Sequence, residues 1–144
     1  MPWYQYSLFR SGQSRPMVEG TLWHEGRHVR VVSLVDSGAD VSLFNMSYAQ
    51  DLGLNPAEAQ RTRAVGAGGA AVDCLSWSDL ELEFDQVRFP FAGRFVDLPA
   101  STPRMNLLGR RDFFQRYIVQ FWDAAGLFGI DLSPDFPRDS QRIV

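Results

Sequence analysis

The sequence predicts a mostly β, single-domain fold with one or two short helices. Its apolar residues fall in short runs, and several of these alternate with polar residues, as residues 80–84 do, which is typical of half-buried strands. Turn-forming residues separate the runs. A chain of 144 residues that is 45% hydrophobic and 22% charged has the size and composition of one globular domain.

The expected strands are apolar or β-branched runs that end at turn residues. They cover residues 3–9, 16–23, 28–35, 61–72, 80–84, 87–96, 117–121 and 127–130. Turns at 24–27 and 123–126 join their flanking strands into hairpins, and the glycines of 66–69 tip a hairpin within 61–72.

Two short segments favour helix. Residues 47–54 could be capped by Ser47 and ended by Gly53. The apolar stretch at 106–114 is expected to be buried and to run into a second short helix. Residues 1–131 then form the domain, and residues 132–144, which include two prolines and several charges, form a loose tail.

Composition limits the partners and the location of the protein. A net charge of −3 argues against nucleic acid as a partner. The single cysteine, Cys74, excludes an intrachain disulfide and is expected to be a small packed residue, which fits a reducing compartment such as the cytoplasm. No apolar run is long enough to span a membrane, and no signal peptide is visible.

One aspartate stands in an unusual position. The run at 29–34 is β-branched and apolar, and it leads into Val35-Asp36-Ser37-Gly38-Ala39-Asp40. Asp36 is therefore expected at the end of a buried strand, where a carboxylate costs free energy unless neighbouring groups stabilise it. Proteins accept this cost mainly at catalytic sites. The alternative is a turn in which Asp36 only bonds to its own backbone.

In its surroundings this segment resembles the active-site loop of retropepsin-like (retroviral-type) aspartic proteases. An apolar strand leads into the aspartate, a glycine-rich hairpin follows, and Leu107-Leu108-Gly109-Arg110 lies about seventy residues further on. These features stand in the family's order between residues 16 and 121. The resemblance implies a retropepsin-like acid protease fold in which each chain supplies half of a two-fold dimeric active site.

The chemistry implied by this family uses two aspartates that share one proton. One acts as general base on a water molecule, and the other donates a hydrogen bond to the scissile carbonyl. Because the chain has a single Asp-Ser-Gly, the second carboxylate is expected from Asp36 of another copy. The resemblance thus implies a homodimeric aspartic endopeptidase that cleaves extended protein or peptide substrates without a cofactor or metal.

The resemblance also assigns roles to the residues around Asp36. Ser37 would lie beneath the aspartate pair and bond to the other chain, and Gly38 would let the substrate backbone approach closely. Ala39 would belong to the site. Asp40 would contact the substrate main chain and pair with Arg110.

Two further parts of the chain take roles from the resemblance. Ala67 and Gly68 would belong to a flap that closes over the substrate and excludes water. The chain ends would interleave into a sheet between subunits, and the N-terminal aromatic residues and the strand at 127–130 are the candidates. The four tryptophans are expected in the core or at an interface.

Three other interpretations remain. A domain of the same fold could act as a binding or scaffolding module without catalysis. His24-Glu25-Gly26-Arg27-His28 is a literal H-E-x-x-H, but its flanks alternate like strands, whereas the zinc motif needs a helix. The glycines at 66–69 suggest a dinucleotide loop, but a strand rather than a helix is expected after them.

Overall fold

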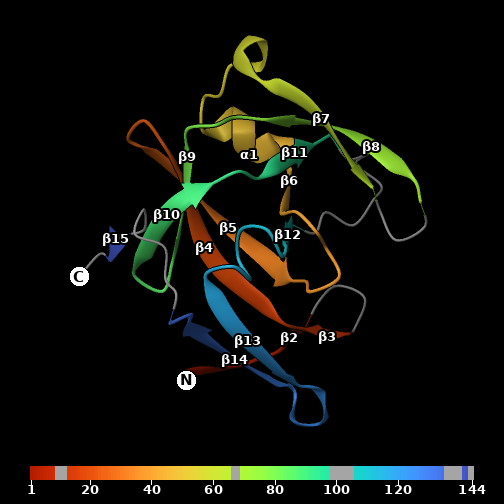
Figure 1. Cartoon of the computed structure of the whole chain (residues 1–144), viewed down its shortest axis with the longest axis vertical. Helices are drawn as coiled ribbons and strands as arrows, with labels where there is room; N and C mark the ends of the chain where they lie inside the picture. Colours follow the sequence, from red (N-terminus) through yellow and green to blue (C-terminus); the bar gives the residue numbers. More distant parts are fainter. Residues whose placement is uncertain (9–12, 66–68, 98–105, 135–140, 143–144) are drawn as a thin grey trace.

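A computed structural model of the chain describes residues 1–8, 13–65, 69–97, 106–134 and 141–142 (Figure 1). Its strands form sheets of ten, three and two strands, which confirms the mostly β prediction. The described residues also contain one short α-helix, α1 (Met46–Asp51), and two 3-10 helices, η1 (Pro56–Glu58) and η2 (Asp123–Ala125). In this part of the chain, no helix has the length and hydropathy needed to cross a membrane.

The ten-stranded sheet carries most of the fold. In spatial order its strands are β15 (Gln141–Arg142), β10 (Val87–Phe91), β9 (Leu80–Phe84), β4 (Met17–His24), β5 (Arg27–Val35), β12 (Asn106–Leu108), β6 (Leu43–Asn45), β11 (Arg94–Val96), β8 (Ala71–Ser76) and β7 (Gln60–Val65). Because β7 stands last, its outer edge has no strand partner among the described residues. The hairpins predicted at 16–35 and 61–72 and the strand at 80–84 are all present.

The β4–β5 hairpin turns on Glu25 and Gly26, whose φ angles are 46° and 78°. Two consecutive residues with positive φ are the mark of the tight turn that matches the twist of paired strands. Its strands pair from His24–Arg27 at the turn down to Met17–Leu34. The C-terminal end of the long strand β5 lies in the middle of the ten-stranded sheet.

Strand β12 inserts between β5 and β6. It runs parallel to β5, with Leu108 opposite Val35, and it pairs antiparallel with β6 where Leu107 lies opposite Leu43. Parallel pairing requires a long crossover connection, here the chain between residues 35 and 106. The segment predicted to be buried at 106–108 therefore lies beside the end of β5.

A smaller sheet contains the first strand of the chain and the β13–β14 hairpin. Its strands are β1 (Trp3–Gln5), β14 (Leu127–Leu132) and β13 (Tyr117–Trp122), and β2 (Ser7–Leu8) pairs with β3 (Ser14–Arg15) beside it. The predicted final hairpin is confirmed. The strand expected at 3–9 is divided into β1 and β2, and Phe9 lies outside the described residues.

The helix predictions need two corrections. Helix α1 is capped by Asn45, whose Oδ1 accepts the Ser47 N–H at 3.0 Å, and not by Ser47 itself. Gly53 does follow the helix in the left-handed conformation, with φ 70°. The second expected helix is instead a series of hydrogen-bonded turns over 110–116, because the chain must enter β13 at Tyr117.

Buried aromatic and aliphatic side chains fill the space between the two larger sheets. Phe113 stacks on Tyr117 with ring centroids 4.7 Å apart, and the Tyr117 hydroxyl donates to the Phe84 carbonyl at 3.1 Å. Cys74 is buried, as predicted, and burial raises its pKa. Within the tail expected to be loose, β15 pairs with β10.

Candidate active site

Asp36 lies where β5 leaves the sheet. Its backbone N–H donates to the Leu108 carbonyl at 3.0 Å, so β12 fixes the first residue of the loop. One carboxylate oxygen accepts the Gly38 N–H at 2.9 Å, and the Ala39 N–H closes the turn on the Asp36 carbonyl at 3.2 Å. The backbone bonds fix the turn, and the bond from the Gly38 N–H orients the carboxylate.

Gly109 makes the close approach of β12 to this loop possible. Its N–H donates to the buried Ser42 hydroxyl at 2.9 Å. A Cβ at Gly109 would lie 2.5 Å from the backbone carbon and oxygen of Val41, a distance that real Cβ atoms essentially never show. Only glycine therefore fits where the two segments cross.

Backbone bonds also connect the next two residues to the loop. The N–H groups of Arg110 and Arg111 donate to the carbonyls of Ala39 and Asp40 at 2.8 and 3.0 Å. The exposed side chains of Asp40 and Arg110 border one depression, but no ion pair joins these two described residues. The pairing that the resemblance implied is therefore absent here, where both charges remain solvated.

Asp112 is a titratable group that sequence reasoning did not single out. Its Oδ1 accepts the Ala92 N–H at 3.3 Å, which ties the 110–116 turns to the segment between β10 and β11. Burial raises the pKa of Asp112, and the Ala92 N–H and the positive charges of Arg116 and Arg111 offset this effect only in part.

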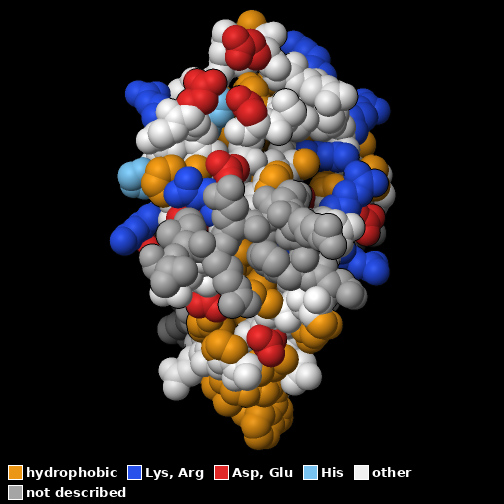
Figure 2. Space-filling model, turned by 60° about the vertical axis from the view of Figure 1, so that its left-hand side comes forward, with side chains coloured by type: hydrophobic (Ala, Val, Ile, Leu, Met, Phe, Trp, Pro, Cys, Tyr) orange, Lys and Arg blue, Asp and Glu red, His pale blue; other side chains and the backbone are white. Residues whose placement is uncertain are grey.

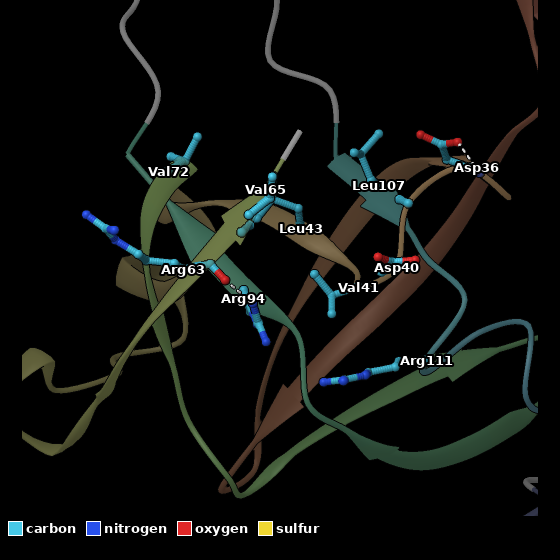
Figure 3. Close-up of a pocket in the computed structure, with 13 residues that line it drawn as sticks. Asp36, Asp40, Val41, Leu43, Arg63, Val65, Val72, Arg94, Leu107 and Arg111 are labelled. Atoms are coloured by element: carbon cyan, nitrogen blue, oxygen red, sulfur yellow. Dashed lines mark hydrogen bonds between the residues drawn. The ribbon is translucent and has the colours of Figure 1, made fainter. Parts of the chain in front are cut away.

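A cavity of about 520 Å³ opens beside Asp36 (Figure 3). The loop contributes Asp36, Gly38, Ala39 and Asp40 to its lining. The remaining lining residues are aliphatic or basic: Val41, Leu43, Ala64, Val65, Val72, Leu107, Arg63, Arg94 and Arg111. In Figure 3 the side chains of Arg94 and Arg111 extend toward one another, on the side of the cavity away from Asp36.

Asp36 also lines a second cavity, of about 700 Å³. Ser37, which is exposed and does not line the first cavity, borders this one together with Asp36. Its lining also includes Phe121 and Gly126, from the β13–β14 hairpin. Asp36 therefore borders two cavities.

The predicted flap is represented by its two strands. Strands β7 and β8 place Val65 and Val72 along the first cavity, whereas Ala67 and Gly68 lie outside the described residues. The chain continues from the glycine loop into β8, so the helix that a dinucleotide loop requires is absent at this position.

The H-E-x-x-H sequence does not form the zinc motif. It spans the β4–β5 turn, and His28 packs against Trp23, with ring centroids 4.6 Å apart. The His24 imidazole lies 3.7 Å from the carboxylate of Glu25 and 3.6 Å from that of Asp79. The two histidines therefore do not share a helical face.

Sequence reasoning missed the three arginines of the first cavity. Arg63 could have been found, since alternation along β7 places it on the same face as Val65. Arg94 and Arg111 come from separate segments that reach the cavity only through the pairing of β11 with β6 and the backbone bond of Arg111 to the loop. Nothing in the sequence indicates that these two residues line the same cavity.

Comparisons with known proteins agree with this geometry. The protease of EIAV, solved in complex with the inhibitor HBY-793, has a similar structure, with a TM-score of 0.55 at 20% sequence identity. The similarity covers 72% of this chain and 88% of that protease. No protein with a curated description matches the sequence. Residues 18–111 match the family model for aspartyl proteases, so the chain belongs to the aspartyl protease family and has the retropepsin-like fold.

Proposed function

We propose that the protein is an aspartic endopeptidase that acts as a homodimer with Asp36 of each copy in one active site. The observation that carries this proposal is the Asp36 turn itself. It holds a carboxylate by backbone bonds at the border of two open cavities, and the chain has a single such Asp-Ser-Gly sequence.

A dyad of two Asp36 carboxylates accounts for catalysis without a covalent intermediate. Like charges at such short range disfavour double ionisation, so the pair holds one proton. The ionised carboxylate takes a proton from water as the water attacks the carbonyl carbon. The protonated carboxyl donates to the carbonyl oxygen and stabilises the charge that develops there.

Exposed apolar residues support a second copy as the partner. Trp3, Ile118, Phe121 and Trp122 are between 40% and 57% exposed, and all belong to the three-stranded sheet. Figure 2 shows hydrophobic side chains gathered at the lower end of the molecule, where Figure 1 places the β13–β14 hairpin. Since Phe121 also borders the cavity at Ser37, a copy docked there would reach the aspartate turn.

The outer edge of β7, which has no strand partner among the described residues, supports an extended peptide as the substrate. Unpaired N–H and C=O groups on an edge strand can bond to a peptide laid beside it, and the cavity would receive alternate side chains. In this arrangement Ser37 supports the dyad, and Gly38, Ala39 and Asp40 line the substrate path. The flap residues Ala67 and Gly68 would close over the peptide.

The test is cleavage of an unfolded protein by the wild type and by Asp36→Asn, from pH 4 to pH 7 with a chelator present. We expect the wild type to cleave best at acidic pH, where the dyad keeps its proton, and the variant to lose activity at an unchanged solution mass. Equal cleavage by both proteins would contradict the proposal. A dimeric wild type that cleaves nothing would favour a binding module of the same fold.

A further inference from the structure

We propose that the arginine end of the first cavity is a subsite for an acidic side chain, foremost glutamate, of the bound peptide. This inference rests on the proposed function, since it assigns a preference to the same peptide-binding cleft. The subsite lies on the wall formed by β11 and the 110–116 turns, away from Asp36 (Figure 3).

Two of the three cavity arginines form no ion pair with an acidic side chain of the described residues, and the charge of Arg111 also acts on Asp112, which lies outside the cavity lining. Arg63 is paired, because its Nε lies 3.2 Å from the Asp73 carboxylate. Arg94 and Arg111 form no ion pair with any described residue. A carboxylate that reached both guanidinium groups would gain charge-assisted hydrogen bonds.

Arg94 is held in place before any ligand binds. Its side chain is half-buried, and its guanidinium donates to the backbone carbonyl of Arg63. This bond uses one of five N–H donors, so the others stay available. A side chain that is already ordered loses less conformational entropy on binding, which favours its use as a recognition group.

Asp40 is the negative charge that opposes this preference. It borders the same cavity but belongs to the loop of Asp36, and its backbone carbonyl, not its carboxylate, accepts the Arg111 N–H. Among the residues that line the arginine end, two guanidinium groups are accompanied by one carboxylate. Asp112, on which the charge of Arg111 also acts, lies outside the lining and accepts the Ala92 N–H. The remaining positive charge favours an anionic ligand over a cationic one.

The walls between the two ends explain why glutamate is preferred to aspartate. Val41, Leu43 and Val65 line the cavity, so a side chain that crosses it packs methylene groups on apolar surface. Glutamate has one more methylene than aspartate and carries its carboxylate further from the peptide backbone. It combines apolar packing near the main chain with charge recognition at the far end.

The first experiment measures kcat/KM for otherwise identical peptides that carry Glu, Gln or Lys at each position beside the scissile bond. At one position we expect Glu to exceed Gln by about tenfold, as for a charge-assisted pair, with Lys the poorest. In the Arg94→Gln and Arg111→Gln enzymes, the kcat/KM for the Glu peptide divided by that for the Gln peptide should fall toward one. Arg30→Gln makes the same charge change on a residue that pairs with Glu19 outside the cavity, and it should keep the wild-type ratio.

A second readout separates this proposal from the proposed function. Binding of the same peptides to Asp36→Asn, measured by calorimetry, needs no catalysis, and the Glu preference should persist there. Equal binding of the Glu and Gln peptides, a preference for Lys, or no binding of any peptide would overturn the subsite. A preserved Glu preference with no cleavage by the wild type would contradict the peptidase and leave the subsite intact.

Discussion

At the scale of single residues, the site depends on two glycines, because a Cβ atom at either position would come too close to a neighbouring group. Gly109 passes the Val41 backbone where a Cβ would lie at 2.5 Å, and Gly38 leaves Asp36 Oδ1 just enough room, since a Cβ there would lie at 3.2 Å. The carboxylate of Asp36 keeps its orientation only while both contacts remain this close.

Gly109→Ala should lower the free energy of unfolding by about 3 kcal/mol, because rigid backbone atoms must move to admit the methyl group. Urea denaturation measures this loss. Gly26→Ala is the control, since a Cβ at Gly26 meets nothing within 4 Å and only its φ of 78° is unfavourable, at a cost of about 1 kcal/mol. Equal losses in both variants would show that the crossing is not tight.

Asp112→Asn should remove a pH-dependent cost. Burial raises the folded-state pKa of Asp112 above the ordinary 3.8, so the folded state holds this proton more tightly than the unfolded chain. The wild type therefore loses stability as pH rises from about 3.8 through the raised pKa. In urea denaturation, the stability of the variant minus that of the wild type should therefore be larger at pH 7 than at pH 3. The opposite trend would contradict the assignment.

At the scale of elements, the sequence predicts contacts that are local and misses those that are distant. The β4–β5 and β13–β14 hairpins were predictable because their turns lie between adjacent alternating runs. Strand β6 and its pairing with β12 were not predicted. A three-residue strand carries no local sequence signal for a partner that lies some sixty positions further along the chain. The cap at Asn45 was missed because Ser47, two residues later, is also a common capping residue type.

Glu25→Asn should stabilise the β4–β5 hairpin. Glu25 has a φ of 46°, which asparagine tolerates better, and its own side chain is 78% exposed, so its 3.7 Å contact with His24 contributes little. We expect a gain of about 0.5–1 kcal/mol in urea denaturation.

The same variant tests the zinc interpretation. Glu25 would be the general base of a zinc protease, so the expected outcome is undiminished cleavage by Glu25→Asn when no chelator is present. A loss of activity at unchanged stability would restore that alternative.

At the scale of the whole molecule, the exposed sheet and the Asp36 turn should act together. Trp122→Ser should raise the dissociation constant of the proposed dimer by about tenfold or more, because Trp122 is exposed on the proposed interface and interface tryptophans contribute strongly to binding. Activity should then fall at low protein concentration and recover at high concentration. Sedimentation velocity and activity across a dilution series measure both effects.

Val32→Ser is the matched control, since Val32 is 51% exposed on β5, outside the three-stranded sheet. It should leave the dilution series unchanged. If Trp122→Ser also leaves it unchanged, the subunit contact lies elsewhere.

The sequence likewise reveals those parts of the site whose residues are neighbours in the chain and misses those whose residues are far apart in it. Asp36 through Asp40 form one continuous loop that a motif can show, and the structure places them on one turn. Arg94 and Arg111 line the same cavity only because β11 pairs with β6 and the Arg111 N–H bonds to Asp40, so the charge of the cavity could not be derived from the chain order.

The position of β12 has a consequence for the order of folding. The Asp36 loop takes its bonds from Leu108 through Arg111, so more than seventy residues must be synthesised after Asp36 before the loop can be ordered. Contacts of such long sequence separation form slowly and late. Under the proposed function, a partly made chain therefore contains its aspartate without the ordered loop that catalysis would need, and cleavage at this centre would begin only when the fold is nearly complete.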